Sequence, residues 1–187
     1  KNATGSISST GAFNATGNVN LAANITTTNT DLTIGGNLVI AEAASPTLST
    51  GAGAGHIVVT GTTNGTAGGA AESLTVLAGT GNVTFTGDVG NNTDALELEA
   101  LTVTSAATTL FSGKIELANA LTQSAGSVAT TFNDTVNVGS AALTGTAYNL
   151  NNSFSSGGAT TITNSGTLTK NATGSISSTG AFNATGN

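Results

Sequence analysis

The same eighteen residues occur twice in this chain, and this repeat constrains the fold more than any other feature of the sequence. Residues 1–18 read KNATGSISSTGAFNATGN, and residues 170–187 read the same. An ungapped identity of this length is not a chance match, so a second copy of a unit begins at Lys170. We expect residues 1–169 to be one tandem repeat unit and residues 170–187 to begin the next, as in proteins built from stacked repeats.

The charge balance excludes several classes of function. The only Lys or Arg residues are Lys1, Lys114 and Lys170, against nine acidic residues, and the formal net charge is −6. Nucleic acids and anionic membranes are bound by clustered basic side chains, so we expect no nucleic-acid partner. No segment approaches the ~20 apolar residues that a membrane span needs, so we expect no membrane insertion of this region.

The composition also favours a secreted chain. Only 6% of the residues are charged, whereas about a quarter is usual, so hydroxyl and amide groups must solvate the surface. Such a surface has few ion pairs for salt to screen and few sites for trypsin-like proteases. The chain has no cysteine, so its stability must come from backbone hydrogen bonds and packing. We expect an extracellular, cell-surface location.

Apolar and polar residues alternate in many short runs, which Gly, Asn and Ser separate. This period of two predicts β-strands joined by turns. The stretch 94–101 (DALELEAL) contains helix-forming residues, but its Leu and Glu residues alternate, so it is predicted as strand too. The clearest predicted strands are residues 19–21, 31–34, 38–40, 57–60, 74–77, 82–86, 96–104, 114–117, 135–138 and 160–163.

The phenylalanines indicate a shorter repeat inside the unit. They are Phe13, Phe85, Phe111, Phe132, Phe154 and Phe182, and all intervals after the first are of similar length. The first interval, from Phe13 to Phe85, fits three coils of about 24 residues in which aliphatic residues replace the aromatic ring. We expect these six side chains to form an aligned column in the core, with about seven coils in each 169-residue unit.

Stacked coils of this length predict an all-β fold, a right-handed parallel β-helix (β-solenoid), because a single coil cannot bury its own apolar face. Val, Ile, Leu and Phe are expected to fill the interior, and Gly and Asn the corners, where the backbone takes positive φ. Strand prediction does not distinguish parallel from antiparallel pairing. Two β-sandwich domains per unit therefore remain the alternative fold.

Three segments resemble the β-strand-repeat regions of giant bacterial surface proteins, including filamentous-haemagglutinin-like and autotransporter adhesins. They are GNVTFTGDVG (81–90), LTVTSAATTLFSGKIEL (101–117) and ATTFNDTVNVGSAALTG (129–145). The resemblance covers most of the chain. It implies a secreted parallel β-helix held at the bacterial cell surface, with a role in adhesion or in a biofilm matrix, and no catalytic residues.

Few residues suggest chemistry. His56 is the single histidine, so a catalytic triad or a zinc site would lack its partners, and we expect a solvated turn residue. Glu97 and Glu99 lie two positions apart on one strand, about 7 Å between like positions, which suits a pair of glycosidase carboxylates. The chain has no Arg, no Trp and only Tyr148 to stack on a sugar ring. We therefore expect solvent-facing glutamates and no enzymatic activity.

Asp88 and Asp94 are the candidate calcium ligands, because the loop 87–94 (GDVGNNTD) is rich in oxygen donors. This loop has neither the spacing of an EF-hand nor the Gly-Gly-x-Gly-x-Asp motif, so the sequence predicts no cofactor.

The function that these observations favour is a structural repeat of an extracellular fibre, sheath or cell-surface stalk. Its expected partners are adjacent repeats and copies of itself, joined through stacked β-coils. The alternative is an adhesin module that binds surface glycans or proteins of a host or a neighbouring cell.

Overall fold

The structure, a computed structural model, describes residues 2–3, 5–66, 71–91, 98–171 and 173–186. Within these residues all regular elements are β-strands, and every strand pair is parallel. The fold is a β-solenoid, as predicted. The alternative of two β-sandwich domains is wrong, since such sandwiches are built from antiparallel pairs.

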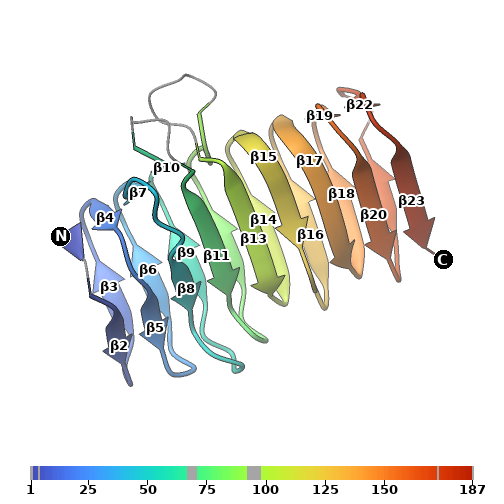
Figure 1. Cartoon of the computed structure of the whole chain (residues 1–187). Helices are drawn as coiled ribbons and strands as arrows, with labels where there is room; N and C mark the ends of the chain where they lie inside the picture. The colour runs from blue at the N-terminus through green and yellow to red at the C-terminus, as the bar shows by residue number, and fades with distance from the viewer. Residues whose placement is uncertain (1, 4, 67–70, 92–97, 172, 187) are drawn as a thin grey trace.

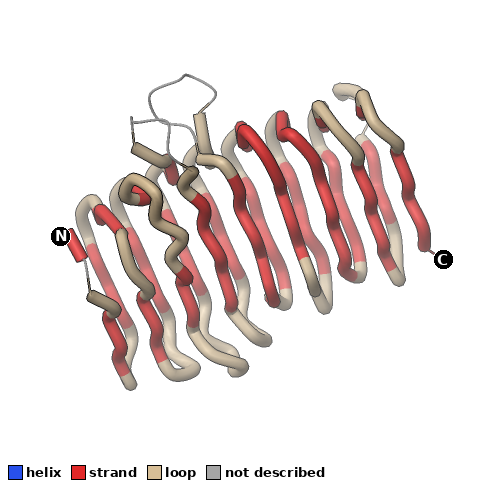
Figure 2. The backbone as a smooth tube through the Cα atoms, in the orientation of Figure 1, coloured by secondary structure: helices blue, strands red, loops and turns tan. Residues whose placement is uncertain are grey.

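Each coil of the solenoid passes along three faces (Figures 1 and 2). In Figure 1 the chain descends the front, ascends the back and advances from left to right, which makes the coil right-handed. The third face takes one strand from each coil and has eight strands, so the chain makes about eight turns. Its strands are β3 (Phe13–Ala15), β6 (Leu32–Ile34), β9 (Ile57–Val59), β12 (Val83–Phe85), β14 (Thr108–Phe111), β16 (Ala129–Phe132), β18 (Ala147–Leu150) and β21 (Leu168–Lys170).

The first and second faces lie side by side. The first face contains β1 (Asn2–Ala3), β4 (Val19–Leu21), β7 (Leu38–Ile40), β10 (Thr63–Asn64), the beginnings of β15 (Ile115–Gln123) and β17 (Val136–Gly145), β19 (Phe154–Ser156) and β22 (Ile176–Ser178). The second contains β2 (Ile7–Ser9), β5 (Ile25–Thr27), β8 (Thr47–Ser49), β11 (Ser73–Leu77), β13 (Ala100–Ser105), the ends of β15 and β17, β20 (Thr160–Asn164) and β23 (Phe182–Gly186).

The period of two in the sequence sorts side chains between the interior and the solvent. Leu32 and Ile34 of β6 are buried and Thr33 is half-buried, and β7, β9 and β12 repeat this pattern. The buried apolar side chains from Val19 to Ile162 form a single core along the axis, and partly buried Ile7 and Ile176 pack against it. Each fully buried Val, Leu, Ile or Phe stabilises the fold by about 1.5–3 kcal/mol relative to exposure.

The phenylalanines do not form the single column that their spacing suggests. Phe85, Phe111 and Phe132 occupy one register position on the third face. Phe154 lies on the first face opposite Val136, because the coil from Phe132 to its register partner Leu150 is shorter than the two coils before it. In the first coil, Ala15 occupies the register position that these three rings share, and Phe13 lies two residues before it. Phe182 lies on the second face.

These shifts change the coil count. The interval from Phe132 to Phe182 looks like two coils in the sequence, one before Phe154 and one after it. The chain passes along eight faces over this interval, or two and two-thirds coils. The repeat unit therefore contains nearly eight coils, where the phenylalanine spacing predicts about seven.

Candidate functional site

Ladders of side chains at the corners join each coil to the next. In the ladder before the third face, the His56 backbone N–H donates to Asp31 Oδ1 at 2.8 Å. The Asn82 N–H then donates to His56 Nδ1 at 3.0 Å, and the Thr108 N–H to Asn82 Oδ1 at 3.2 Å. Each side chain thus accepts the N–H of the equivalent corner one coil further along. His56 is exposed, and its ring serves as a ladder acceptor.

A second ladder lies at the corner before the first face. The Asn37 N–H donates to Asn18 Oδ1 at 2.9 Å, and the Thr62 N–H donates to Asn37 Oδ1 at 3.1 Å. Further along, the Lys114 N–H donates to Asp88 Oδ1 at 2.9 Å. The predicted calcium ligand Asp88 therefore holds two coils together through one carboxylate oxygen.

The other candidate ligand, Asp94, lies outside the described residues, so the structure does not place the two aspartates relative to each other. Among the residues that are described, no three His, Asp or Glu side chains are grouped to hold a metal ion.

Of the two glutamates considered for catalysis, Glu97 lies outside the described residues. Glu99 is half-buried, and its Oε1 accepts a hydrogen bond from Asn119 Nδ2 at 3.3 Å. Asn119 lies one coil further along, and its backbone N–H also donates to the Glu99 carbonyl at 2.8 Å. Glu99 thus contributes to coil stacking.

An asparagine ladder follows the corner between the third and first faces on the last coils. Asn151 Nδ2 donates to Asn133 Oδ1 at 2.8 Å, and Asn171 Nδ2 donates to Asn151 Oδ1 at 2.7 Å. The amide has both a donor and an acceptor, so one asparagine per coil can extend such a ladder indefinitely.

Residue pairs in the sequence could have revealed the corner ladders. In several coils an Asn or Asp directly precedes the first apolar residue of a strand, as in Asn18-Val19, Asp31-Leu32 and Asn37-Leu38. Such an Asx residue reads as a turn former, which hides its second role as an acceptor for the neighbouring coil.

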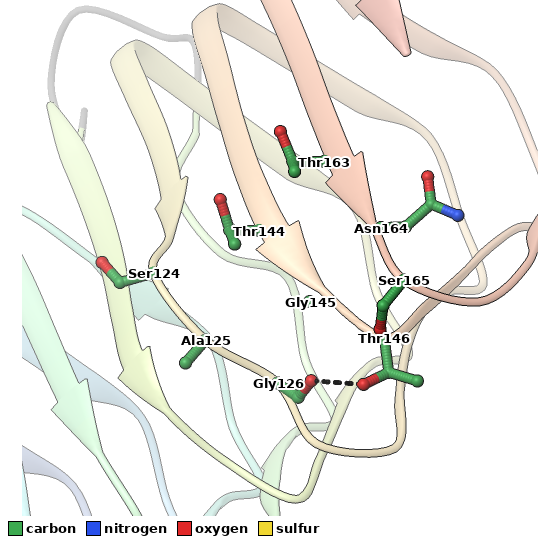
Figure 3. A pocket seen from close by; sticks show the side chains of 9 residues that line it. All are labelled: Ser124, Ala125, Gly126, Thr144, Gly145, Thr146, Thr163, Asn164 and Ser165. Atoms are coloured by element: carbon green, nitrogen blue, oxygen red, sulfur yellow. Dashed lines mark hydrogen bonds between the residues drawn. The ribbon is translucent and has the colours of Figure 1, made fainter. Parts of the chain in front are cut away.

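A shallow depression of about 370 Å³ lies at the corner between the second and third faces (Figure 3). Residues 124–126, 144–146 and 163–165, from three successive coils, line it. Its lining combines hydroxyls, one amide and backbone with the apolar surface of Ala125 and the threonine methyl groups, and Thr146 Oγ1 donates across it to the Gly126 carbonyl at 3.0 Å. These groups suit a small, uncharged polar ligand such as a sugar hydroxyl.

Tyr148 is fully buried in the core on the third face. Its hydroxyl has no hydrogen-bond partner among the residues that the structure describes. Burial raises the pKa of the Tyr148 phenol well above its ordinary value, because the charged phenolate would lose its hydration.

We expect Tyr148→Phe to raise the free energy of unfolding by about 1 kcal/mol, since it removes an unsatisfied buried hydroxyl and keeps the ring. Urea unfolding followed by far-UV circular dichroism measures this change. Tyr148→Leu is the control, and it should lower the stability because it removes ring contacts. A loss of stability in Tyr148→Phe would show that the hydroxyl has a partner.

The strands of the first and last described coils are more exposed than the strands between them. Phe182 of β23 is 42% exposed, whereas Phe154 on the coil before it is 1% exposed. β23 pairs with β20 on one side only.

None of the described residues belongs to a helix long and apolar enough to cross a membrane. Searches against protein-family models, curated proteins and solved structures find no match to this chain.

Proposed function

We propose that this chain is a non-catalytic structural repeat of an extracellular fibre, sheath or cell-surface stalk, of the kind found in giant bacterial β-strand-repeat surface proteins. The observation that carries the proposal is the pairing of the second copy with the first. β22 and β23 belong to the second copy, and they stack in parallel on β19 and β20 of the first. The β-ladder therefore runs across the repeat boundary without interruption.

A continuous ladder suits a mechanical role. Each coil contacts only its neighbours, so a longer chain of repeats lengthens the rod without changing its cross-section. β23 pairs with β20 as β20 pairs with β17, so the second copy repeats the stacking of the first. The partners that this stacking favours are adjacent repeats and copies of the same chain.

The surface chemistry agrees with a location outside the cell. Threonine, serine and asparagine occupy most outward strand positions, such as Thr102, Thr122 and Thr161 on the second face. With only 6% charged residues, coil stacking depends little on ion pairs and should resist changes in salt. The cell-surface location remains part of the proposal.

The length of the rod per repeat tests the proposal. Chains of two, four and six units should lengthen by roughly 37 Å per unit in electron microscopy or small-angle scattering, because nearly eight coils stack at ~4.8 Å each. Two compact domains per unit would add roughly 60 Å instead. An increment near that larger value would exclude a continuous solenoid and the stalk function with it.

The second candidate is an adhesin module, and the depression over residues 124–126, 144–146 and 163–165 favours it. Binding of the 187-residue chain to an array of glycans separates the two functions. A glycan whose binding is lost in Gly126→Val, with the fold intact by circular dichroism, would favour the adhesin. Absence of glycan binding would favour the passive stalk.

A further inference from the structure

The two identical copies of the eighteen-residue segment lie on different faces of the solenoid. In the first copy Ile7 is on the second face, where it pairs with Ile25, and Phe13 is on the third. In the second copy the equivalent Ile176 is on the first face, where it pairs with Phe154, and Phe182 is on the second. Each strand of the second copy therefore lies one face earlier in the coil than the equivalent strand of the first copy.

We infer that consecutive repeat units are rotated by one third of a turn about the solenoid axis. Ile7 lies on the second face of the first coil, and Ile176 lies on the first face of the ninth coil. Between these two residues the chain makes eight turns minus one face, which is one third of a turn. One repeat unit therefore makes seven and two-thirds coils. This inference rests on the proposed function, because it describes how the stalk continues from unit to unit.

Corner lengths explain the rotation. In the coils before the boundary, the end of each third-face strand and the start of the next first-face segment are four positions apart, as from Ala15 to Val19 and from Phe132 to Val136. An unrotated second copy would place Asn171, the counterpart of Asn2, on the first face one position after Lys170. One residue spans at most ~3.6 Å, too little for a corner that takes four positions elsewhere.

The connection that does form is six positions long, from Lys170 to Ile176, and its described residues make several hydrogen bonds. Lys170 Nζ donates to the carbonyls of Asn171 and Thr173, both at 2.6 Å. Thr173 Oγ1 donates to the carbonyl of Asn151 on the coil below at 2.8 Å. Gly174 takes a φ of +80°, which favours glycine at this point of the turn.

The small residues of the segment suit both positions. Ser177 Oγ donates to Ser155 Oγ at 3.2 Å, and the Ser175 N–H donates to Ser153 Oγ at 3.2 Å, so two serines of the second copy stack on two serines of the coil before. Ile176 covers the buried ring of Phe154.

Rotation has a consequence for how the stalk meets its surroundings. A feature that occurs once per unit, such as the depression at residues 144–146, points in three directions over three units and returns to its first direction after about 110 Å. No face of the stalk then carries one continuous row of identical features. Lateral contacts with neighbouring chains are distributed around the axis.

Paired cysteines in the 187-residue chain test the rotation, and the chain has no cysteine of its own. Ser155→Cys/Ser177→Cys joins Cα partners on adjacent strands of the first face, at a spacing that suits a disulfide. Thr163→Cys/Ser177→Cys places the other cysteine on the second face, at the register position where an unrotated Ser177 would stack. Ser8→Cys/Thr26→Cys, which joins Cα partners in the first copy, is the matched control.

After mild oxidation, peptide mass spectrometry should find the Ser155→Cys/Ser177→Cys disulfide in most molecules, as in the control, and the Thr163→Cys/Ser177→Cys disulfide at background level. The reverse result would overturn the rotation and leave the continuous solenoid intact. Equal yields of the two would also overturn it, since the segment would then occupy both faces. If only the control pair oxidises, the second copy does not stack, and both the rotation and the proposed stalk fail.

Discussion

Replacing Phe111 with alanine should lower the free energy of unfolding by about 3–5 kcal/mol, the range for aromatic-to-alanine changes in a packed core. Phe111 is 2% exposed and lies between two other rings, with its centroid 5.4 Å from that of Phe85 and 5.2 Å from that of Phe132. The ring plane of Phe111 is within 4° of parallel to that of Phe85 and within 2° of parallel to that of Phe132. The alanine variant therefore loses contacts on both faces of the ring. Urea unfolding followed by Tyr148 fluorescence measures the loss.

Two further variants show whether the loss comes from the stacked position. Phe182→Ala removes the same side chain where it is 42% exposed, and it should cost less than about 1 kcal/mol. Phe111→Leu should cost about 1–1.5 kcal/mol, because aliphatic Val59 and Leu150 occupy the same register position in other coils. Equal losses in Phe111→Ala and Phe182→Ala would contradict a core held by this stack.

The strands and their stacking were predictable from the sequence because they depend on local pattern. Val19–Leu21 and Leu38–Ile40 have the predicted bounds, and Ile57–Val59 ends one residue earlier than predicted. Short alternating runs between glycine and asparagine leave few folds other than stacked coils for a chain this poor in charge.

The register of the coils was not predictable from the same pattern, because coil length varies with corner length. The separation of Phe132 and Phe154 in the sequence resembles one coil, yet Phe132 pairs with Leu150 and Phe154 pairs with Val136. β15 and β17 also pass from the first face to the second within one strand, and the register of their pairing shifts between Leu117 and Ala120. No periodicity in the sequence marks these changes.

The candidate site was less predictable than the fold. His56 and Asp88 stood out in the sequence as isolated chemical groups, and the structure makes both of them acceptors in corner ladders. Their role depends on a backbone N–H that lies 26 positions away in each case, a distance set by the length of the intervening coil. A motif search treats such residues singly, whereas a solenoid uses them in rows.

The second large effect is expected at Gly90, where the backbone φ is +74°. A Cβ at this position would lie 1.8 Å from the Glu116 carbonyl oxygen of the next coil, a backbone atom that cannot move aside without breaking the ladder. The Gly90 N–H donates to the Thr63 carbonyl at 2.7 Å on the opposite side, which prevents the strand from shifting away. Gly90→Ala should therefore lower the free energy of unfolding by roughly 2–4 kcal/mol.

Gly17→Ala is the matched control for that variant, because a Cβ at Gly17 meets no atom within 4 Å and its φ is not positive. It should leave the stability unchanged or raise it by about 0.4–1 kcal/mol, since alanine restricts the unfolded chain. Both variants can be compared by urea unfolding at one protein concentration. If Gly90→Ala unfolds at the same urea concentration as Gly17→Ala, the coils are not packed at the close backbone spacing that a continuous β-ladder requires. That result would remove the main structural argument for the proposed stalk function.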